Sequence, residues 1–223
     1  MKSTTRMTTV RVKTAKKRKL ASTLWLERQL NDPYVQQAKV DGYRSRAAYK
    51  ILEIDDKFKI FKKGMKVLDL GAAPGGWSQV AVNRTKNGRV FALDILEMQS
   101  IPGVKFMQLD FLQDDAPEKV MEFIGGKADA VLTDMAANAC GNPQVDHMRI
   151  TILCELAFEF AKSVLAENGV FVAKLLRGGG DHKLLMEIKK NFKTVKNFKP
   201  KSSRADSAEI YLVALGFKPQ NVE

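Results

Sequence analysis

Short apolar runs rich in β-branched residues alternate with segments of helical periodicity along most of the chain. The apolar runs predict seven strands, at residues 67–70, 89–93, 104–109, 128–132, 170–174, 195–198 and 210–215. The segments between them predict helices near residues 77–86, 116–124, 145–166 and 181–191. Strands that alternate with helices form parallel βαβ units, so we expect an α/β fold whose mostly parallel sheet has helices on both faces. The last strand follows a connection too short for a helix, which predicts that it runs antiparallel.

Two patterns inside the predicted helices give more specific expectations. Residues 25–43 have a helical pattern, and residues 44–54 continue it as one amphipathic helix. Within residues 145–166, apolar side chains recur at every fourth position, namely Met148, Ile152, Leu156, Phe160 and Val164. We expect this stripe to face the sheet.

The composition is that of an ordinary folded protein. Of the 223 residues, 45% are apolar and 28% are charged, and the length suits one domain that buries most of its apolar surface. No apolar stretch approaches the roughly 18 residues of a membrane span, which excludes a membrane protein. The two cysteines, Cys140 and Cys154, have no paired spacing, so neither a zinc site nor a disulfide framework is supported. We therefore expect a cytoplasmic protein with no bound metal.

Positive charge is concentrated at the N-terminus. The formal net charge is +12, and the first 26 residues contribute +8 because they carry eight lysines and arginines and no acid. We expect residues 1–22 to form a basic arm, residues 23–218 the folded domain and residues 219–223 a short tail. Such an arm favours a polyanionic partner, because lysine and arginine displace counterions from phosphates. A solvated tail and an organelle transit peptide are the alternatives, and the few, badly spaced apolar residues disfavour the second.

A glycine-rich turn in the segment 68–78 follows the first predicted strand and leads into a helix. Glycines let the backbone approach a ligand closely because no Cβ intervenes. The segment is not a phosphate-binding P-loop, because Trp77 stands where that motif has the lysine that neutralises phosphate. It is not a dinucleotide-binding turn either, because Ala73 replaces the second glycine of that pattern.

Three acidic residues, Asp69, Asp94 and Asp110, lie at or near the ends of the first three predicted strands. Ligands of such sheets bind beyond the carboxyl ends of the strands, where Asp94 can accept the hydroxyls of a ribose and Asp110 the amino group of an adenine. Together with Gly71 and Gly75, these acids suit a ligand that has an adenosine and a positive centre but no phosphates. S-adenosylmethionine has that chemistry. Taken singly, each aspartate is equally consistent with a helix cap or a turn.

The later strands indicate which group receives the methyl. The segment 133–138 lacks the aromatic run with which amino-group methyltransferases hold a flat base, and Cys140 is not preceded by the proline of enzymes that attack a pyrimidine ring. Four charged residues instead lie at strand ends or just upstream of the sheet: Lys50, Asp134, Lys174 and Glu209. Two lysines and two acids suit activation of a hydroxyl, with Lys174 either as general base or as stabiliser of the developing oxyanion. Two surface ion pairs are the alternative interpretation.

Several motifs carry a resemblance to a known family. They are Tyr34 to Ala38, Arg44 to Ala47, the turn from Leu68 to Gln79, Ser202 to Ala205, and Glu209 to Tyr211. On these residues the chain resembles the FtsJ/RrmJ family of S-adenosylmethionine-dependent ribosomal RNA 2'-O-ribose methyltransferases, over residues 24–217. The chain departs from the family pattern at Ala137, where the family often has proline, and we expect a less stiff loop there.

The resemblance implies a Rossmann-like methyltransferase fold and a catalytic tetrad at Lys50, Asp134, Lys174 and Glu209. It implies cofactor contacts at Gly75, Trp77, Asp94, Asp110 and Asp134. The implied partner is large-subunit (23S) ribosomal RNA, methylated on a uridine ribose of the A-loop within the assembled 50S subunit, by an enzyme that we expect to be a monomer.

Two other functions are consistent with the sequence. The same chemistry can act on the anticodon loop of transfer RNA. A non-catalytic assembly factor would instead dock on RNA without turnover, through the basic arm and through Arg44, Arg46 and the segment 202–204. The lysines and acids beside a cofactor pocket argue against that second function, because a pure binding module does not need them.

Overall fold

A seven-stranded mixed sheet forms the centre of the computed structural model, which describes Arg11 and residues 20–137, 140–178 and 182–219. Its strands are β1 (Lys66–Leu70), β2 (Arg89–Asp94), β3 (Val104–Gln108), β4 (Ala128–Thr133), β5 (Leu165–Leu176), β6 (Phe192–Phe198) and β7 (Glu209–Phe217). They lie in the order β3-β2-β1-β4-β5-β7-β6, and β7 runs antiparallel to both of its neighbours. The α/β class, the seven strands and the antiparallel last strand are therefore confirmed.

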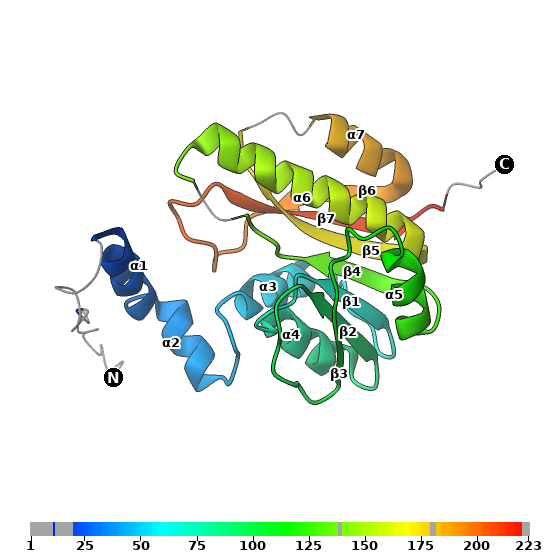
Figure 1. Ribbon diagram of the computed structural model, residues 1–223, viewed down its shortest axis with the longest axis horizontal. Helices are drawn as coiled ribbons and strands as arrows, with labels where there is room; N and C mark the ends of the chain where they lie inside the picture. The colour runs from blue at the N-terminus through cyan, green and yellow to red at the C-terminus, as the bar shows by residue number, and fades with distance from the viewer. Residues whose placement is uncertain (1–10, 12–19, 138–139, 179–181, 220–223) are drawn as a thin grey trace.

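Helices cover both faces of the sheet (Figure 1). Helices α3 (Ala48–Phe58) and α4 (Gly76–Thr85) bury Ile51, Trp77 and Val80 against one face. Helices α5 (Ala116–Ile124), α6 (Pro143–Val164) and α7 (His182–Asn191) pack on the other face, where Phe158 and Ile188 are fully buried. The result is the three-layer arrangement that alternating strands and helices predict.

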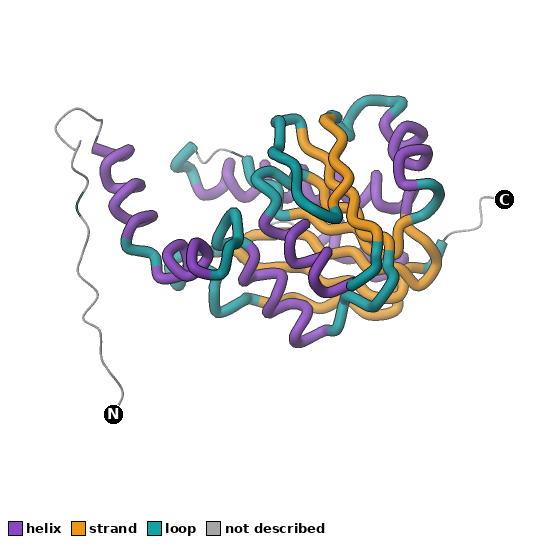
Figure 2. The backbone as a smooth tube through the Cα atoms, turned by 90° about the horizontal axis from the view of Figure 1, so that it is seen from below, coloured by secondary structure: helices purple, strands orange, loops and turns teal. Residues whose placement is uncertain are grey.

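The N-terminal helical segment differs from its prediction. The chain forms two helices there, α1 (Leu20–Leu30) and α2 (Pro33–Val40), which extend away from the sheet (Figures 1 and 2). The break falls at Asp32, whose side chain accepts a hydrogen bond from the backbone N–H of Tyr34, while Pro33 occupies the first turn of α2. Proline disfavours helical geometry in the residue before it but suits the start of a helix, so one continuous helix over 25–43 was wrong.

The prediction of one helix over residues 44–54 was also wrong at its beginning. Helix α3 starts at Ala48, and Arg44 lies in the loop before it. The backbone N–H of Arg44 donates to Oε1 of Gln79 at 2.8 Å, in helix α4. The backbone N–H of Arg44 thus has a hydrogen-bond partner although Arg44 is not part of a helix. Because Gln79 is far from Arg44 in the sequence, a long-range contact contributes to where α3 begins.

The apolar stripe of α6 faces the sheet only in part. Phe160 and Val164 are buried, but Met148 and Ile152 are exposed. A strict four-residue repeat drifts by about 40° per step around a helix with 3.6 residues per turn, so its two ends lie on different faces. The buried residues of α6 are Ile150, Cys154, Ala157, Phe158, Phe160, Ala161 and Val164.

The predicted arm, residues 1–22, and the predicted tail, residues 219–223, lie mostly outside the described part of the chain. Helix α1 begins at Leu20, shortly before the expected start of the folded domain at residue 23. Of the basic arm, only Arg11 and residues 20–22 are described. None of the described helices combines the length and the apolar character that a membrane span requires.

Candidate active site

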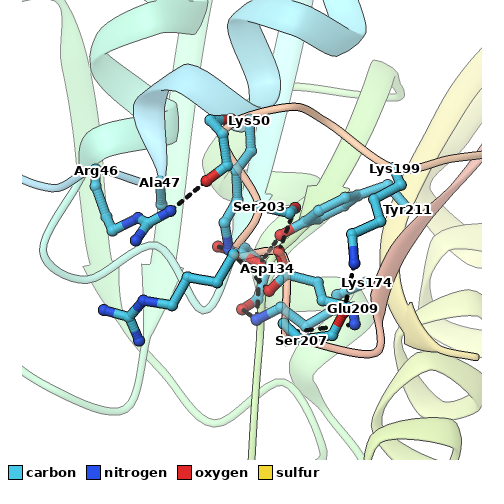
Figure 3. Close-up of polar contacts among 12 residues, drawn as sticks. Arg46, Ala47, Lys50, Asp134, Lys174, Lys199, Ser203, Ser207, Glu209 and Tyr211 are labelled. Carbon is cyan, nitrogen blue, oxygen red and sulfur yellow. Dashed lines mark hydrogen bonds and ion pairs between the residues drawn. The ribbon is translucent and has the colours of Figure 1, made fainter. Parts of the chain in front are cut away.

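Four charged side chains meet near the carboxyl ends of β4 and β5 (Figure 3). Asp134 directly follows β4, Lys174 lies near the end of β5, and Glu209 is the first residue of β7. Lys50 comes from the first turn of α3. The strand order reverses between β1 and β4, which is where open α/β sheets bind their ligands.

Ion pairs join these four residues into one cluster. Nζ of Lys174 lies 2.7 Å from Oδ1 of Asp134 and also donates to the backbone oxygen of Asp134 at 2.6 Å. Nζ of Lys50 lies 2.8 Å from Oε2 of Glu209 and 3.6 Å from Oδ2 of Asp134. The four side chains have exposed fractions between 9% and 18%, so two surface ion pairs are not the correct interpretation.

Asp134 is the centre of the cluster, and its surroundings keep it ionised. Burial acts to raise its pKa, but the charges of Lys174 and Lys50 and hydrogen bonds from Lys174 and Tyr211 outweigh burial and lower the pKa below its ordinary value. The ionised carboxylate of Asp134 lies within ion-pair distance of both lysines. Asp134 is therefore the anion that the two lysines share.

Tyr211 belongs to this cluster, although reasoning from the sequence assigned it no role. Its hydroxyl donates to Oδ1 of Asp134 at 2.6 Å, and the centroid of its ring lies 5.5 Å from Nζ of Lys50. Burial, followed by the charges of Asp134 and Glu209, holds the pKa of Tyr211 well above its ordinary value, so the phenol remains a donor. Strand periodicity could have indicated this position of Tyr211. Residues two apart in a strand share a face, so Tyr211 points to the same side as Glu209.

Ser203, which the sequence suggested only as part of an RNA-docking segment, also belongs to the cluster. It is buried in the loop between β6 and β7, and its hydroxyl donates to Oε1 of Glu209 at 2.8 Å. Glu209 is therefore held by Ser203 on one oxygen and by Lys50 on the other. No local pattern indicates this contact, because it depends on the path of the loop.

A pocket of about 800 Å³ adjoins the cluster at the ends of the central strands. Its lining includes Gly71, Asp94, Asp110 and Asp134, four of the residues predicted to hold a cofactor. The carboxylate of Asp94 accepts hydrogen bonds from the backbone N–H of Ala73 and of Leu96, both at 2.8 Å, one on each oxygen. Each oxygen keeps capacity for another donor, such as a hydroxyl.

Apolar residues complete the pocket. They are Leu93, Ile95, Leu96, Leu109, Phe111, Leu112, Met135, Ile152 and Leu153, beside Arg149 and the alanines 73, 136 and 137. The contribution of α6 through Arg149, Ile152 and Leu153 was missed, because the stripe containing Ile152 was expected to face the sheet. The exposed beginning of that helix instead borders the pocket.

Three other predicted cofactor residues lie outside the pocket lining. Asp69 is buried beneath the turn, where the hydroxyl of Ser78 donates to it at 2.6 Å. Burial, only partly offset by that hydrogen bond, raises the pKa of Asp69 to about 7. Trp77 is also buried, and its indole N–H donates to the backbone oxygen of Ala47 at 2.9 Å. The third residue is Gly75.

Two positions of the turn, Gly71 and Gly75, require glycine for structural reasons. Gly75 adopts a φ of 105° at the start of α4, and a Cβ there would collide with the side chain of Ile101. Gly71 adopts a φ of 70°, and a Cβ there would collide with the side chain of Met135. Both positions thus need glycine for backbone conformation and for close approach.

The cysteines and histidines take no part in the cluster. Cys154 is buried in α6, whereas Cys140 is exposed. His147 lies on α6 and is hydrogen bonded to the backbone oxygen of Leu176, and His182 begins α7. In the described ranges, no group of three histidine, cysteine, aspartate or glutamate side chains is arranged to hold a metal ion.

Arginines that an RNA-docking surface would use are largely bound within the protein. The guanidinium of Arg44 donates to the backbone oxygens of Gln99 at 2.6 Å, Ser100 at 2.7 Å and Pro74 at 3.2 Å. Arg46 and Arg204 both pair with Asp32. These two arginines also line a second pocket of about 380 Å³, with Arg28, Gln29, Lys50, Asp206, Ser207 and Glu209.

Known proteins resemble this chain over nearly its full length. It is 57% identical over 220 residues to the ribosomal RNA large subunit methyltransferase E of Parvibaculum lavamentivorans, which covers 94% of this chain and 87% of that protein. A protein of the same name from Bradyrhizobium sp. is 56% identical over 221 residues, which covers 97% of this chain and 96% of that protein.

A solved structure shows the same architecture. A crystal structure from Plasmodium falciparum, described provisionally as a ribosomal RNA methyltransferase, is 34% identical and superposes with a TM-score of 0.72. The match covers 80% of this chain and all of that one.

The sheet order, the antiparallel β7 and these similarities define a methyltransferase of the Rossmann-like class. Residues 43–217 match the FtsJ-like methyltransferase family, and the chain belongs to that family. The resemblance seen in the sequence motifs is thereby confirmed.

Proposed function

We propose that this protein is an S-adenosylmethionine-dependent 2'-O-ribose methyltransferase that modifies a uridine of large-subunit ribosomal RNA. The single observation that carries the proposal is the ion-paired cluster of Lys50, Asp134, Lys174 and Glu209 beside a pocket at the carboxyl ends of the strands. The names of the relatives support ribosomal RNA of the large subunit as substrate. In this proposal the protein acts on the assembled 50S subunit late in maturation, as a cytoplasmic monomer that needs no metal ion.

The pocket fits the proposed cofactor in size and chemistry. A volume of about 800 Å³ lies within the usual range of cofactor sites. Asp94 offers carboxylate oxygens suited to ribose hydroxyls, and Phe111 and Ile152 offer apolar surface suited to an adenine. When bound, S-adenosylmethionine supplies a methyl group on a sulfonium.

The charged cluster suits a hydroxyl acceptor. A ribose hydroxyl is a weak nucleophile at neutral pH, so its proton must leave or the charge developing on its oxygen must be offset. Lys174 reaches that oxygen in our proposal, and Asp134 holds its Nζ through both the carboxylate and the backbone oxygen. Glu209 and Tyr211 hold Lys50 and Asp134 in place.

Replacement of Lys174 by arginine separates the general-base role from the charge-stabilising role. A guanidinium keeps the positive charge but does not accept a proton at neutral pH. Substantial activity in Lys174→Arg supports a role in offsetting charge, whereas loss of activity with intact cofactor binding supports a general base. Methylation rates measured across pH for both proteins complete the comparison.

The substrate is tested by offering labelled S-adenosylmethionine in parallel to isolated large subunits, small subunits and transfer RNA. We expect label on the large subunit and, after nuclease mapping, on the 2'-oxygen of one uridine. Label on transfer RNA would instead support the alternative of anticodon-loop methylation. Label on a base would show that the acceptor atom was misidentified, and no label on any RNA would contradict the proposal.

A further inference from the structure

A buried carboxylate lies outside the four-residue cluster, at the junction of α1 and α2. Asp32 is only 8% exposed. Its Oδ1 accepts the backbone N–H of Tyr34, which caps α2. Its Oδ2 is shared by two arginines, Arg46 from the loop before α3 and Arg204 from the loop between β6 and β7.

The two guanidinium groups repel each other across this one carboxylate. Arg46 is in direct contact with Oδ2 of Asp32, and Nε of Arg204 lies 3.3 Å from the same oxygen. Burial and the nearby charge of Arg204 lower the pKa of Arg46, which reflects the strain of placing two cations together. Asp32 is the counter-charge that both arginines contact.

This arrangement holds the loop 199–208 against the rest of the protein. Arg46 donates to the backbone oxygen of Ser202. From helix α3, the carboxylate of Glu53 accepts the backbone N–H of Lys201 at 2.6 Å and of Ser202 at 2.8 Å. The next residue, Ser203, donates to Glu209, so a short path of contacts joins Asp32 to the catalytic cluster.

Stability alone does not account for this group. In the part of the chain that the structure describes, the buried polar side-chain atoms without a hydrogen-bond partner are Nε of Arg46, Oγ of Ser202 and Nη2 of Arg204. All three belong to this group. Buried polar atoms without partners and two like charges that share one buried carboxylate both cost free energy, so they indicate a functional reason for the arrangement.

We propose that Asp32 is a positioning residue for methyl transfer. Its carboxylate holds Arg46 and Arg204 together, and this fixes the loop 199–208 so that Ser203 keeps Glu209 against Lys50. The inference rests on the proposed function, because methyl transfer is the reaction that the positioned groups serve. It assigns Arg46 and Arg204 a role within the protein besides any contact with RNA.

The substitution Asp32→Asn tests the charge and spares the helix cap, because asparagine caps helices about as well as aspartate. We expect kcat to fall by about 10- to 100-fold, since small displacements of catalytic groups have effects of that order. The KM for the cofactor should stay unchanged, because Asp32 does not line its pocket. Backbone amide hydrogen exchange at Lys201 and Ser202 should become faster.

The same substitution in a variant that lacks Arg204 shows whether the loss of kcat depends on the pair of arginines. In Arg204→Gln one of the two repelling charges is gone, so Asp32→Asn should cost far less kcat there than in the wild type. If Asp32→Asn alone is unfolded at the assay temperature, the kcat of the double variant Asp32→Asn/Arg204→Gln is compared with that of Arg204→Gln. A difference between these two values then measures the positioning role of Asp32. Asp56→Asn is the matched control, since Asp56 is exposed and pairs with Arg84 away from the cluster.

The outcomes separate this inference from the proposed function. Unchanged kcat and unchanged amide exchange in Asp32→Asn would overturn the positioning role, as would equal losses of kcat in both backgrounds. Failure of the wild type to methylate large subunits would overturn the proposed function instead. Amide exchange would still report whether Asp32 fixes the loop.

Discussion

Asp134 shows how one largely buried side chain organises the charged cluster of Lys50, Asp134, Lys174 and Glu209. It contacts Lys174, Tyr211 and, at longer range, Lys50. Buried ions are costly to remove from water, and the cost is offset only when every charge is paired. The ion pairs of Asp134 and Glu209 with the two lysines meet that condition, and removal of any one of the four residues leaves a partner without its ion pair.

The substitution Lys174→Ala should abolish methyl transfer while leaving the cofactor pocket intact. We expect the rate to fall by about 100-fold or more, as for the loss of a group that handles a proton or a developing charge. Cofactor binding, measured by calorimetry, should change little because Lys174 does not line the pocket. Lys190→Ala is the control, since Lys190 is an exposed lysine of α7. Unchanged methylation in Lys174→Ala would remove Lys174 from the mechanism.

The raised pKa of Asp69 leads to a predicted pH dependence of the free energy of unfolding. Burial raises its pKa to about 7 in the folded protein, whereas the unfolded chain releases the same proton near pH 4. Between these values the native state binds one more proton than the unfolded state, so the free energy of unfolding should fall as pH rises from about 4 to about 7. This contribution is on the order of a few kcal/mol.

The substitution Asp69→Asn should remove that part of the pH dependence. Urea unfolding at pH 5 and pH 8 measures it: relative to the wild type, the variant should be more stable at pH 8 than at pH 5. Asp56→Asn provides an exposed carboxylate as control. The same slope in Asp69→Asn and in the wild type would show that Asp69 does not titrate in this interval.

The loop that precedes α3 links the elements that border the proposed cofactor pocket. Arg44 donates to Pro74 in the glycine turn and to Gln99 and Ser100 in the segment between β2 and β3. That segment begins with Ile95 and Leu96, which line the pocket. One side chain thus joins two walls of the pocket from a third element.

We expect Arg44→Gln to weaken cofactor binding with little effect on the chemical step. Loss of hydrogen bonds from a charged donor suggests a rise in the cofactor KM of about tenfold. At saturating cofactor, kcat should stay close to that of the wild type because the charged cluster is untouched. Arg84→Gln, which alters an arginine of α4 paired with Asp55 and Asp56, is the control. A fall in kcat at saturation with an unchanged KM would contradict this role.

The distribution of charge over the whole chain predicts how the proposed RNA partner is bound. Residues 1–19 hold eight of the positive charges, so their deletion leaves 12 − 8 = +4. We expect weaker binding to large subunits and a flatter salt dependence, with the slope reduced by about 0.7 for each phosphate that the arm neutralises. Filter binding at several salt concentrations measures both quantities. An unaltered slope would show that the arm does not contact phosphates.

Much of the architecture was predictable because periodicity is a local property. The seven strands, the helices between them and the antiparallel β7 all follow from patterns within short windows. The helix boundaries at Pro33 and Ala48 were missed for different reasons. The first is a local proline signal that the helical pattern outweighed, and the second depends on the contact of Arg44 with Gln79, which are far apart in the sequence.

The candidate site was predictable to a lesser extent. Lys50, Asp134, Lys174 and Glu209 meet as expected, and Asp94 and Asp110 line the pocket. Charged residues at the ends of parallel strands reach the same edge of a sheet, which is why their types and positions were informative.

The sequence by itself determined the class of fold and the chemical identity of the groups at the strand ends, because both depend on residue type and on short-range spacing. The tertiary structure alone decided that Tyr211 donates to Asp134, that Ser203 holds Glu209 and that Asp32 pairs with Arg204. Asp32 and Arg204 are 172 positions apart, and no spacing along the chain specifies their contact. Such contacts depend on the strand order and on the path of the loops, which form only when the whole chain packs.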